Sequence, residues 1–268
     1  MIRWTWRNLF WALAIFFLGW TLLAFLINRT ILPYPWEVLP VFVEKFFVPD
    51  RYTATVEQNV GFAVPFGELG IHFFVSAYRV LVAIIIAVLL AAPIGLGLGQ
   101  SARLNQFFAP LIGIIHPIPK IVFLPIILVL LGSGDASKIF LIALILFFQI
   151  LVVVRDEAAG LRPELILSVR SIGAGRRALF RFVYLPASIP AILTALRVSV
   201  GTAIAVLFIA ETYATRSGLG YYIVVRTWQA LRYKEMYAGI LAMSILGLTL
   251  YFLVDGLERR FSKWRNLD

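Results

Sequence analysis

Long runs of hydrophobic residues, separated by shorter polar segments, dominate the chain. Five of them have about the length that crosses the hydrocarbon core of a bilayer; they cover residues 9–27, 73–98, 139–154, 189–210 and 236–254. A sixth run, 107–131, is interrupted by prolines and by Lys120. Because proline removes a backbone donor, this third run in chain order predicts a kinked or broken helix. The pattern predicts an all-α transmembrane protein with about six membrane-spanning helices.

These runs divide the chain into three predicted parts. Residues 1–30 form an N-terminal transmembrane helix, 31–70 form a segment outside the membrane, and 71–268 hold the remaining spans. The first run predicts a retained helix rather than a cleaved signal peptide, because it is long enough to span and lacks a small-x-small cleavage pattern. The polar loop 155–188 is longer than a connection needs, and long ordered loops are usually functional.

Composition agrees with a lipid environment. Hydrophobic residues make up 61% of the 268 residues and charged residues 14%, whereas soluble domains are about 45–50% apolar. The sequence contains no cysteine, which excludes disulfides and thiolate metal sites. Its two histidines, His72 and His116, have no partner at metal-ligand spacing. The sequence therefore predicts no metal site.

The formal net charge is +10, and its distribution indicates a topology. Basic residues are concentrated in one set of segments, above all in loop 155–188: Arg155, Arg162, Arg170, Arg176, Arg177 and Arg181. Lys and Arg are enriched in cytoplasmic loops of membrane proteins. We therefore expect both termini and this loop to be cytoplasmic, and the basic excess needs no nucleic acid partner.

The loop 155–188 carries the pattern of a short helix. Pro163 and Glu164 suit a helical first turn, and Gly173 is placed to end the helix in a left-handed cap. An apolar face is formed by Leu165, Val169 and Ile172, whereas Ser168, Arg170 and Ser171 lie on other faces. Such a helix could bind a cytoplasmic protein, or it could lie on anionic lipid.

At this point the sequence resembles a known family. Gly173-Ala174, followed twelve residues later by Leu185-Pro186, is similar to the second half of the "EAA" loop of binding-protein-dependent ABC importer permeases. Further motifs resemble the nitrate/sulfonate/taurine-type branch: Ser76-x-x-Arg79, Ile118-Pro119-Lys120, Gly132-Ser133-Gly134, Ala210-Glu211-Thr212 and Ser217-Gly218-Leu219-Gly220-Tyr221. The family's Glu-Ala-Ala positions fall here on Leu167, Ser168 and Val169, so the acidic residue is missing. A literal Glu157-Ala158-Ala159 lies too far from Leu185 and is interpreted as the end of a span.

The resemblance implies the type I ABC importer permease fold and a role as the membrane permease subunit in the inner membrane of a bacterium or archaeon. It implies a small solute, such as a nitrate-, sulfonate-, taurine- or bicarbonate-like anion; thiamine and flavin precursors are the alternative. It also implies an extracytoplasmic solute-binding protein, a second permease copy, and separate ATPase subunits that bind ATP and magnesium. The residues that it assigns to ATPase coupling are Glu164, Leu165, Ser168, Val169, Arg170, Ile172, Gly173, Ala174, Leu185 and Pro186.

Charged and polar groups within spans are costly in lipid and are therefore functional candidates. The candidates for a translocation path or gate are Arg79, His116, Lys120, Arg197, Glu211 and Thr212. The structural alternatives are snorkelling for Arg79, packing for the kink, and an interfacial position for Glu211. For Arg197 the alternative is pairing with helix carbonyls or with a carboxylate such as Glu211 or Glu157. The spans lack the acidic groups expected of a secondary transporter, and the chain lacks the paired acidic or His motifs expected of a membrane-embedded enzyme. It also has no GxxxxGK[ST] segment, so we expect it not to hydrolyse ATP itself.

Overall fold

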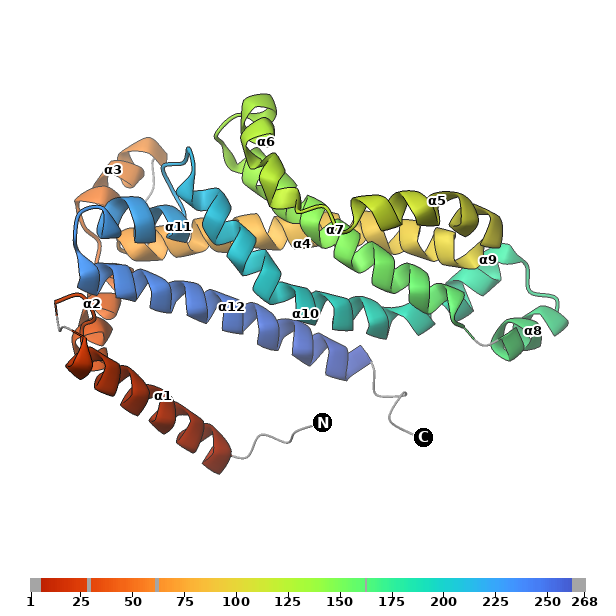
Figure 1. Ribbon diagram of the computed structural model, residues 1–268, viewed down its shortest axis with the longest axis horizontal. Helices are drawn as coiled ribbons and strands as arrows, with labels where there is room; N and C mark the ends of the chain where they lie inside the picture. The colour runs from red at the N-terminus through yellow and green to blue at the C-terminus, as the bar shows by residue number, and fades with distance from the viewer. Residues whose placement is uncertain (1–5, 28–29, 61–62, 162, 262–268) are drawn as a thin grey trace. The chain divides into compact units, whose positions relative to one another are not determined.

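The protein is built from helices (Figure 1). The computed structural model describes residues 6–27, 30–60, 63–161 and 163–261, and these ranges contain no strand. Contacts divide the chain into two units. The first comprises Met1–Ser76 and Thr215–Ile245, and the second comprises Ala77–Ala214 and Leu246–Asp268. The all-α architecture predicted from the sequence is confirmed.

Within the described residues, four helices are long and apolar enough to cross a membrane. Three of them are α4 (Glu68–Gln100), α7 (Asp135–Ala159) and α12 (Tyr233–Phe261). The fourth, Arg177–Thr212, joins α9 (Arg176–Leu179), the π-helical turn η2 (Phe180–Tyr184) and α10 (Leu185–Thr212). Backbone groups in lipid must bond within the segment, which is why apolar runs of this length become helices. All four coincide with predicted spans.

The proline-rich third span is broken, as predicted. α5 (Ala102–Ile115) is followed by the 3-10 turn η1 (Lys120–Phe123) and α6 (Leu124–Leu131), and the two parts are bent by 75°. This bent pair is a fifth candidate span. The predicted first span corresponds to α1 (Trp6–Leu26), which is 21 residues long and whose apolar part, Phe10–Leu26, is shorter than the other spans.

Several helices are longer than the apolar runs. α4 begins at Glu68, five residues before the run, and α12 continues to Phe261 through Asp255 and Glu258. In both helices the added residues carry charges that are paired in the fold: Glu68 with Arg226, and Asp255 and Glu258 with Arg197. A predicted span ended with the run of hydrophobic residues, whereas the helix continues into residues whose charges have partners.

In the second unit, α4 packs closely against α7 at two glycines. A Cβ added to Gly99 would lie 2.5 Å from the Arg155 carbonyl oxygen and 2.6 Å from the Cβ of Ala158. A Cβ at Gly95, one helical turn earlier, would lie 3.0 Å from the Leu151 carbonyl oxygen. Small residues four apart allow helix backbones to approach in this way. α7 also has an extensive contact with α10.

The first unit contains two short helices between the first two apolar runs, α2 (Pro35–Phe47) and α3 (Arg51–Val60). It also contains α11 (Leu219–Tyr221) and the π-helical turn η3 (Tyr222–Trp228), which precede α12. The Thr53 hydroxyl of α3 donates to the Phe66 carbonyl oxygen at 2.9 Å. This bond joins α3 to the segment that leads into α4.

Candidate functional site

The predicted coupling segment, residues 155–188, contains a short helix with a glycine cap. α8 covers Pro163–Ser171, and Gly173 follows with φ +85°, a conformation that favours glycine. The Gly173 and Ala174 amides donate to the carbonyl oxygens of Arg170 and Val169 at 2.9 and 3.4 Å, so orphan carbonyls at the helix end are satisfied. The helix and the left-handed cap agree with the sequence prediction.

Apolar side chains of this segment are exposed. Ile172 is 82% exposed and Leu167 is 61% exposed, whereas Val169 is half-buried. Sequence periodicity did not include Leu167 in the apolar face. The side chain of Leu165 and the whole of Arg162 lie outside the described residues. Leu185 and Pro186 form the first turn of α10, and α8 contacts α9 and η2.

Arg79 lies at the centre of an ion cluster in the second unit, in which Arg79 and Glu211 are buried and the Asp135 side chain is 51% exposed. Its guanidinium contacts Glu211 Oε1 at 2.7 Å and Asp135 Oδ1 at 2.6 Å. Arg79 is 2% exposed and the Glu211 side chain 0%. The ammonium group of Lys138, also fully buried, donates to the Ser133 carbonyl oxygen. The structure thus brings two predicted residues together and adds Asp135 and Lys138, which sequence reasoning did not select.

Lys120 binds backbone carbonyl oxygens at the break in the third span. Its Nζ donates to the carbonyl oxygens of Ile115, His116 and Ile118 at 2.9, 2.6 and 3.2 Å, and it lies 4.6 Å from the centre of the Phe148 ring. Carbonyls at the end of a helix need other donors, and the backbone supplies one of them, since the Ile118 amide donates to the Ile115 carbonyl oxygen at 3.2 Å. Lys120 supplies further donors, whereas the predicted neighbour His116 is exposed.

Arg197 is held by two acids of α12. Its Nη1 lies 3.2 Å from Asp255 Oδ1, and its Nε lies 3.2 Å from Glu258 Oε2. The Thr194 hydroxyl donates to Glu258 at 2.8 Å. The partners suggested from the sequence, Glu211 and Glu157, were wrong, because Glu211 pairs with Arg79 and Arg197 pairs with α12. Antiparallel spans place the first half of α10 beside the second half of α12, a signal that could have identified this pair.

Two motifs of the family resemblance meet in the first unit. The backbone amide of Gly218 donates to His72 Nδ1 at 3.0 Å, and the amide of Leu219 donates to Ser76 Oγ at 2.8 Å. These amides open the helical segment of α11 and need acceptors. Gly218 has φ +105°, and the following Tyr222 is fully buried, which raises the pKa of its hydroxyl. His72 thus accepts a hydrogen bond at the start of α11, a capping role that the sequence analysis did not identify.

Thr212 contributes a local bond, since its hydroxyl donates to the Ile209 carbonyl oxygen at 2.7 Å. Together with the pairs above, this means that Arg79, Lys120, Arg197, Glu211 and Thr212 all bond within the chain. Their role in a path or gate stays a prediction.

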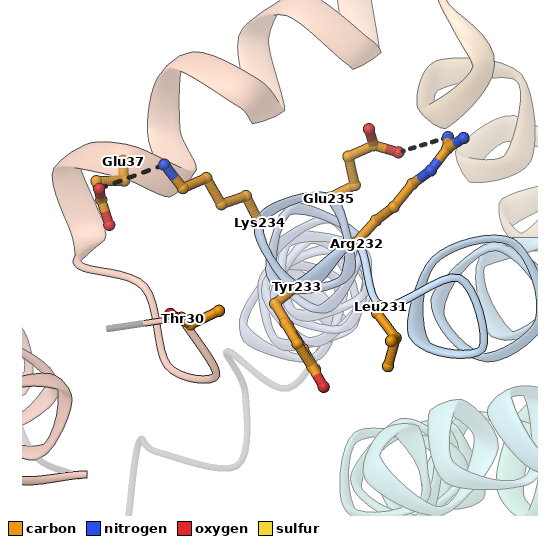
Figure 2. Close-up of a pocket in the computed structure, with 7 residues that line it drawn as sticks. All are labelled: Thr30, Glu37, Leu231, Arg232, Tyr233, Lys234 and Glu235. Carbon is orange, nitrogen blue, oxygen red and sulfur yellow. Dashed lines mark hydrogen bonds and ion pairs between the residues drawn. The ribbon is translucent and has the colours of Figure 1, made fainter. Parts of the chain in front are cut away.

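Two depressions lie away from these residues. The first, of about 500 Å³, is lined by Thr30, Glu37 and residues 231–235 (Figure 2). Its charges form the pairs Glu37–Lys234 at 3.3 Å and Arg232–Glu235 at 3.5 Å. The second, of about 420 Å³, is lined by Val153, Asp156, Glu157, Gly160 and Leu161 at the end of α7. It lies beside the start of the coupling segment.

Comparison with known families identifies the class of protein. Residues 83–265 match the family described as the binding-protein-dependent transport system inner membrane component. The chain belongs to this family. This range contains the bent third span, the coupling segment and the spans from α7 to α12, so the resemblance inferred from the motifs is confirmed.

Among sequence relatives, the taurine transport system permease protein TauC of Escherichia coli (strain K12) is 31% identical over 72% of this chain and 70% of its own length. A putative aliphatic sulfonates transport permease protein, SsuC of Bacillus subtilis (strain 168), is 30% identical over 75% and 72%. The putative ABC transporter permease protein MJ0413 of Methanocaldococcus jannaschii is 30% identical over 87% and 88%. The permease is thus similar to transport subunits along most of its length.

Solved structures agree on the fold. A chain of the MetNI methionine ABC transporter in an inward-facing conformation has a TM-score of 0.60 at 20% identity, covering 70% of the permease and 93% of that chain. A chain of a bacterial ABC transporter involved in the import of the acidic polysaccharide alginate has a TM-score of 0.52 at 16% identity, covering 93% of the permease and 96% of that chain. The permease therefore has the type I ABC importer fold. The family match identifies it as the membrane component of an importer that works with an ATPase and a binding protein.

Proposed function

We propose that this permease imports a small anionic solute of the sulfonate or taurine type. The observation that carries the proposal is the similarity to permeases named for taurine and for aliphatic sulfonates, each at 30% identity or more over more than two thirds of both chains. A nitrate- or bicarbonate-like anion shares the oxyanion chemistry and belongs to the same proposal.

The charges of the spans support weak contact between the permease and its solute. Arg79 and Arg197 are both neutralised by carboxylates of the same chain. A paired guanidinium offers less attraction to an anion than a free one. Recognition is therefore assigned to the extracytoplasmic binding protein, and Arg79, His116, Lys120, Arg197, Glu211 and Thr212 remain the proposed path or gate.

The proposal also includes the assembly. Two permease copies enclose the path, both termini lie in the cytoplasm, and two separate ATPase subunits contact α8. Support for the orientation comes from the basic residues of loop 155–188. Support for the separate ATPase comes from the missing GxxxxGK[ST] segment.

Uptake by the reconstituted complex tests the function. The permease, its ATPase and its binding protein would be placed in vesicles, and uptake of labelled taurine would be measured with ATP inside. We expect uptake that unlabelled sulfonates suppress and thiamine does not. The control is an ATPase variant that lacks its phosphate-binding lysine. ATP-dependent uptake of labelled thiamine or a labelled flavin precursor, with no uptake of labelled taurine, nitrate or bicarbonate, would contradict the anion proposal.

A further inference from the structure

One face of α2 is apolar and exposed. Trp36, Leu39, Val43 and Phe47 are 58, 43, 53 and 54% exposed, and their spacing of three, four and four residues places them on one side of the helix. We call these four residues the α2 stripe. The other side is occupied, since Pro35 and Val38 are buried. At 13 residues, about 20 Å, α2 is too short to cross a bilayer.

The start of α2 is joined to the start of a membrane-spanning helix. Glu37 of α2 pairs with Lys234 of the first turn of α12 at 3.3 Å. The indole N–H of Trp20 in α1 donates to the Pro33 carbonyl oxygen at 3.0 Å, and the Trp20 ring lies 6.1 Å from that of Tyr237 in α12. These contacts fix the depth of the start of α2 at the end of a span.

The end of α2 is joined to the start of another span. The Gly67 amide donates to the Phe46 carbonyl oxygen at 3.0 Å, and the Phe46 ring lies 5.4 Å from that of Phe73 in α4. Glu68, the first residue of α4, bonds to Arg226 at 2.6 Å, so the start of α4 lies beside the segment that precedes α12. The starts of both spans therefore lie at the same membrane face, and α2 connects them.

Aromatic side chains lie at the level where these spans start. The rings of Tyr34 and Trp36 stack 4.6 Å apart at the start of α2, close in sequence to the Pro33 carbonyl that binds Trp20. Tyr and Trp are enriched where the hydrocarbon core meets the headgroups. A short helix at this depth, with an exposed apolar stripe and acids such as Glu44 beside it, has the pattern of an interfacial helix.

We propose that α2 lies in the membrane–water interface on the extracytoplasmic side, with the α2 stripe inserted among the lipid headgroups and upper acyl chains. The occupant of this face is lipid, because the stripe is at the level where the apolar surfaces of α4 and α12 begin and so continues the lipid-facing surface. α2 lies outside the family match at 83–265, and the proposed transport function does not depend on it.

The absence of cysteine makes a direct test available. Leu39→Cys and Val43→Cys would each be labelled with a nitroxide in the complete permease–ATPase complex in lipid nanodiscs. Oxygen and a water-soluble nickel chelate then report exposure to lipid and to water. We expect both positions to be reached by oxygen and protected from nickel, at a depth of about 5–10 Å below the phosphates.

Matched controls lie on the same unit. Glu44→Cys, one residue from Val43 and outside the stripe, should be reached by nickel more readily than positions 39 and 43. Gln58→Cys on α3, also exposed, should show the nickel access of a water-exposed site. Nickel access at 39 and 43 equal to that at 58 would overturn the proposal. Protection from both reagents would also overturn it, because protein, either a second copy or the binding protein, would then cover the stripe.

Discussion

At the residue scale, the arginines Arg79 and Arg197 of the spans form ion pairs within the protein. Arg79 binds Asp135 and Glu211, and Arg197 binds Asp255 and Glu258. A charge in a bilayer is costly unless it is paired or hydrated, so these pairs explain how the ionisable groups are tolerated. A role in transport would require that the pairs open during the cycle.

Replacing Arg197 separates the structural role from the transport role. In Arg197→Leu, Asp255 keeps Arg259 at 2.7 Å, whereas Glu258 keeps the neutral Thr194 hydroxyl. A poorly compensated, partly buried carboxylate should lower the free energy of unfolding by about 1–3 kcal/mol. Thermal unfolding of the purified permease measures this loss, and Arg197→Leu with Glu258→Gln should restore most of it.

Uptake by the same double variant decides between the two roles. If Arg197 lines the path, stability returns and uptake does not, while Arg197→Lys keeps partial uptake. Full uptake by the stable double variant would remove Arg197 from the path.

The sequence located these residues but not their partners. It identified Arg79, Lys120, Arg197 and Glu211 because each is polar within or at the edge of an apolar run. Arg79 and Glu211 are 132 residues apart, and their pairing depends on how helices are rotated against one another, which no local pattern encodes. The bond between Ser76 and Leu219 was hidden for the same reason, although both residues belonged to motifs already selected.

At the element scale, helix ends were less predictable than helix existence. The prolines of 107–131 predicted the broken span, and Gly173 predicted the end of the coupling helix, since both act through local backbone geometry. By contrast, the extension of α12 to Phe261 depends on partners in α10, and the hydrophobic run could not reveal it.

The close contact of α4 with α7 gives a prediction at this scale. Gly99→Leu should force the helices apart, because even a Cβ would lie 2.5 Å from the Arg155 carbonyl oxygen; overpacking of this kind costs about 1–3 kcal/mol. Gly97→Leu is the matched control, since a Cβ there meets nothing within 4 Å. Thermal unfolding of the two variants should show a lower midpoint for Gly99→Leu alone. Equal midpoints would mean that the interface yields without cost.

At the scale of the whole molecule, the range matched to the family divides the chain into two parts. The coupling segment lies within the range matched to the family, 83–265, whereas α1, α2 and α3 lie before it. The family match therefore includes the predicted coupling segment and does not include residues 31–70. It also explains why the sequence resemblance indicated the coupling loop more clearly than residues 31–70.

The last prediction concerns the contact between permease and ATPase. Ile172 is 82% exposed, so Ile172→Asp should leave the fold intact and place a charge in an apolar protein interface. An unpaired carboxylate buried in such a contact costs several kcal/mol, and each 1.4 kcal/mol weakens binding about tenfold. We expect the ATPase to be lost when the variant is purified from membranes at normal expression. Gly173→Pro should have the same effect, because proline cannot adopt φ +85°.

Ser171→Asp is the matched control, since it adds the same charge one residue away at an exposed position outside the predicted apolar face. It should retain the ATPase and the stimulation of ATP hydrolysis by loaded binding protein. Two results would contradict the assignment of α8 to coupling. One is recovery of the ATPase at wild-type yield with Ile172→Asp and Gly173→Pro. The other is equal loss with Ser171→Asp, which would indicate a general effect of negative charge on this basic loop rather than a contact at Ile172.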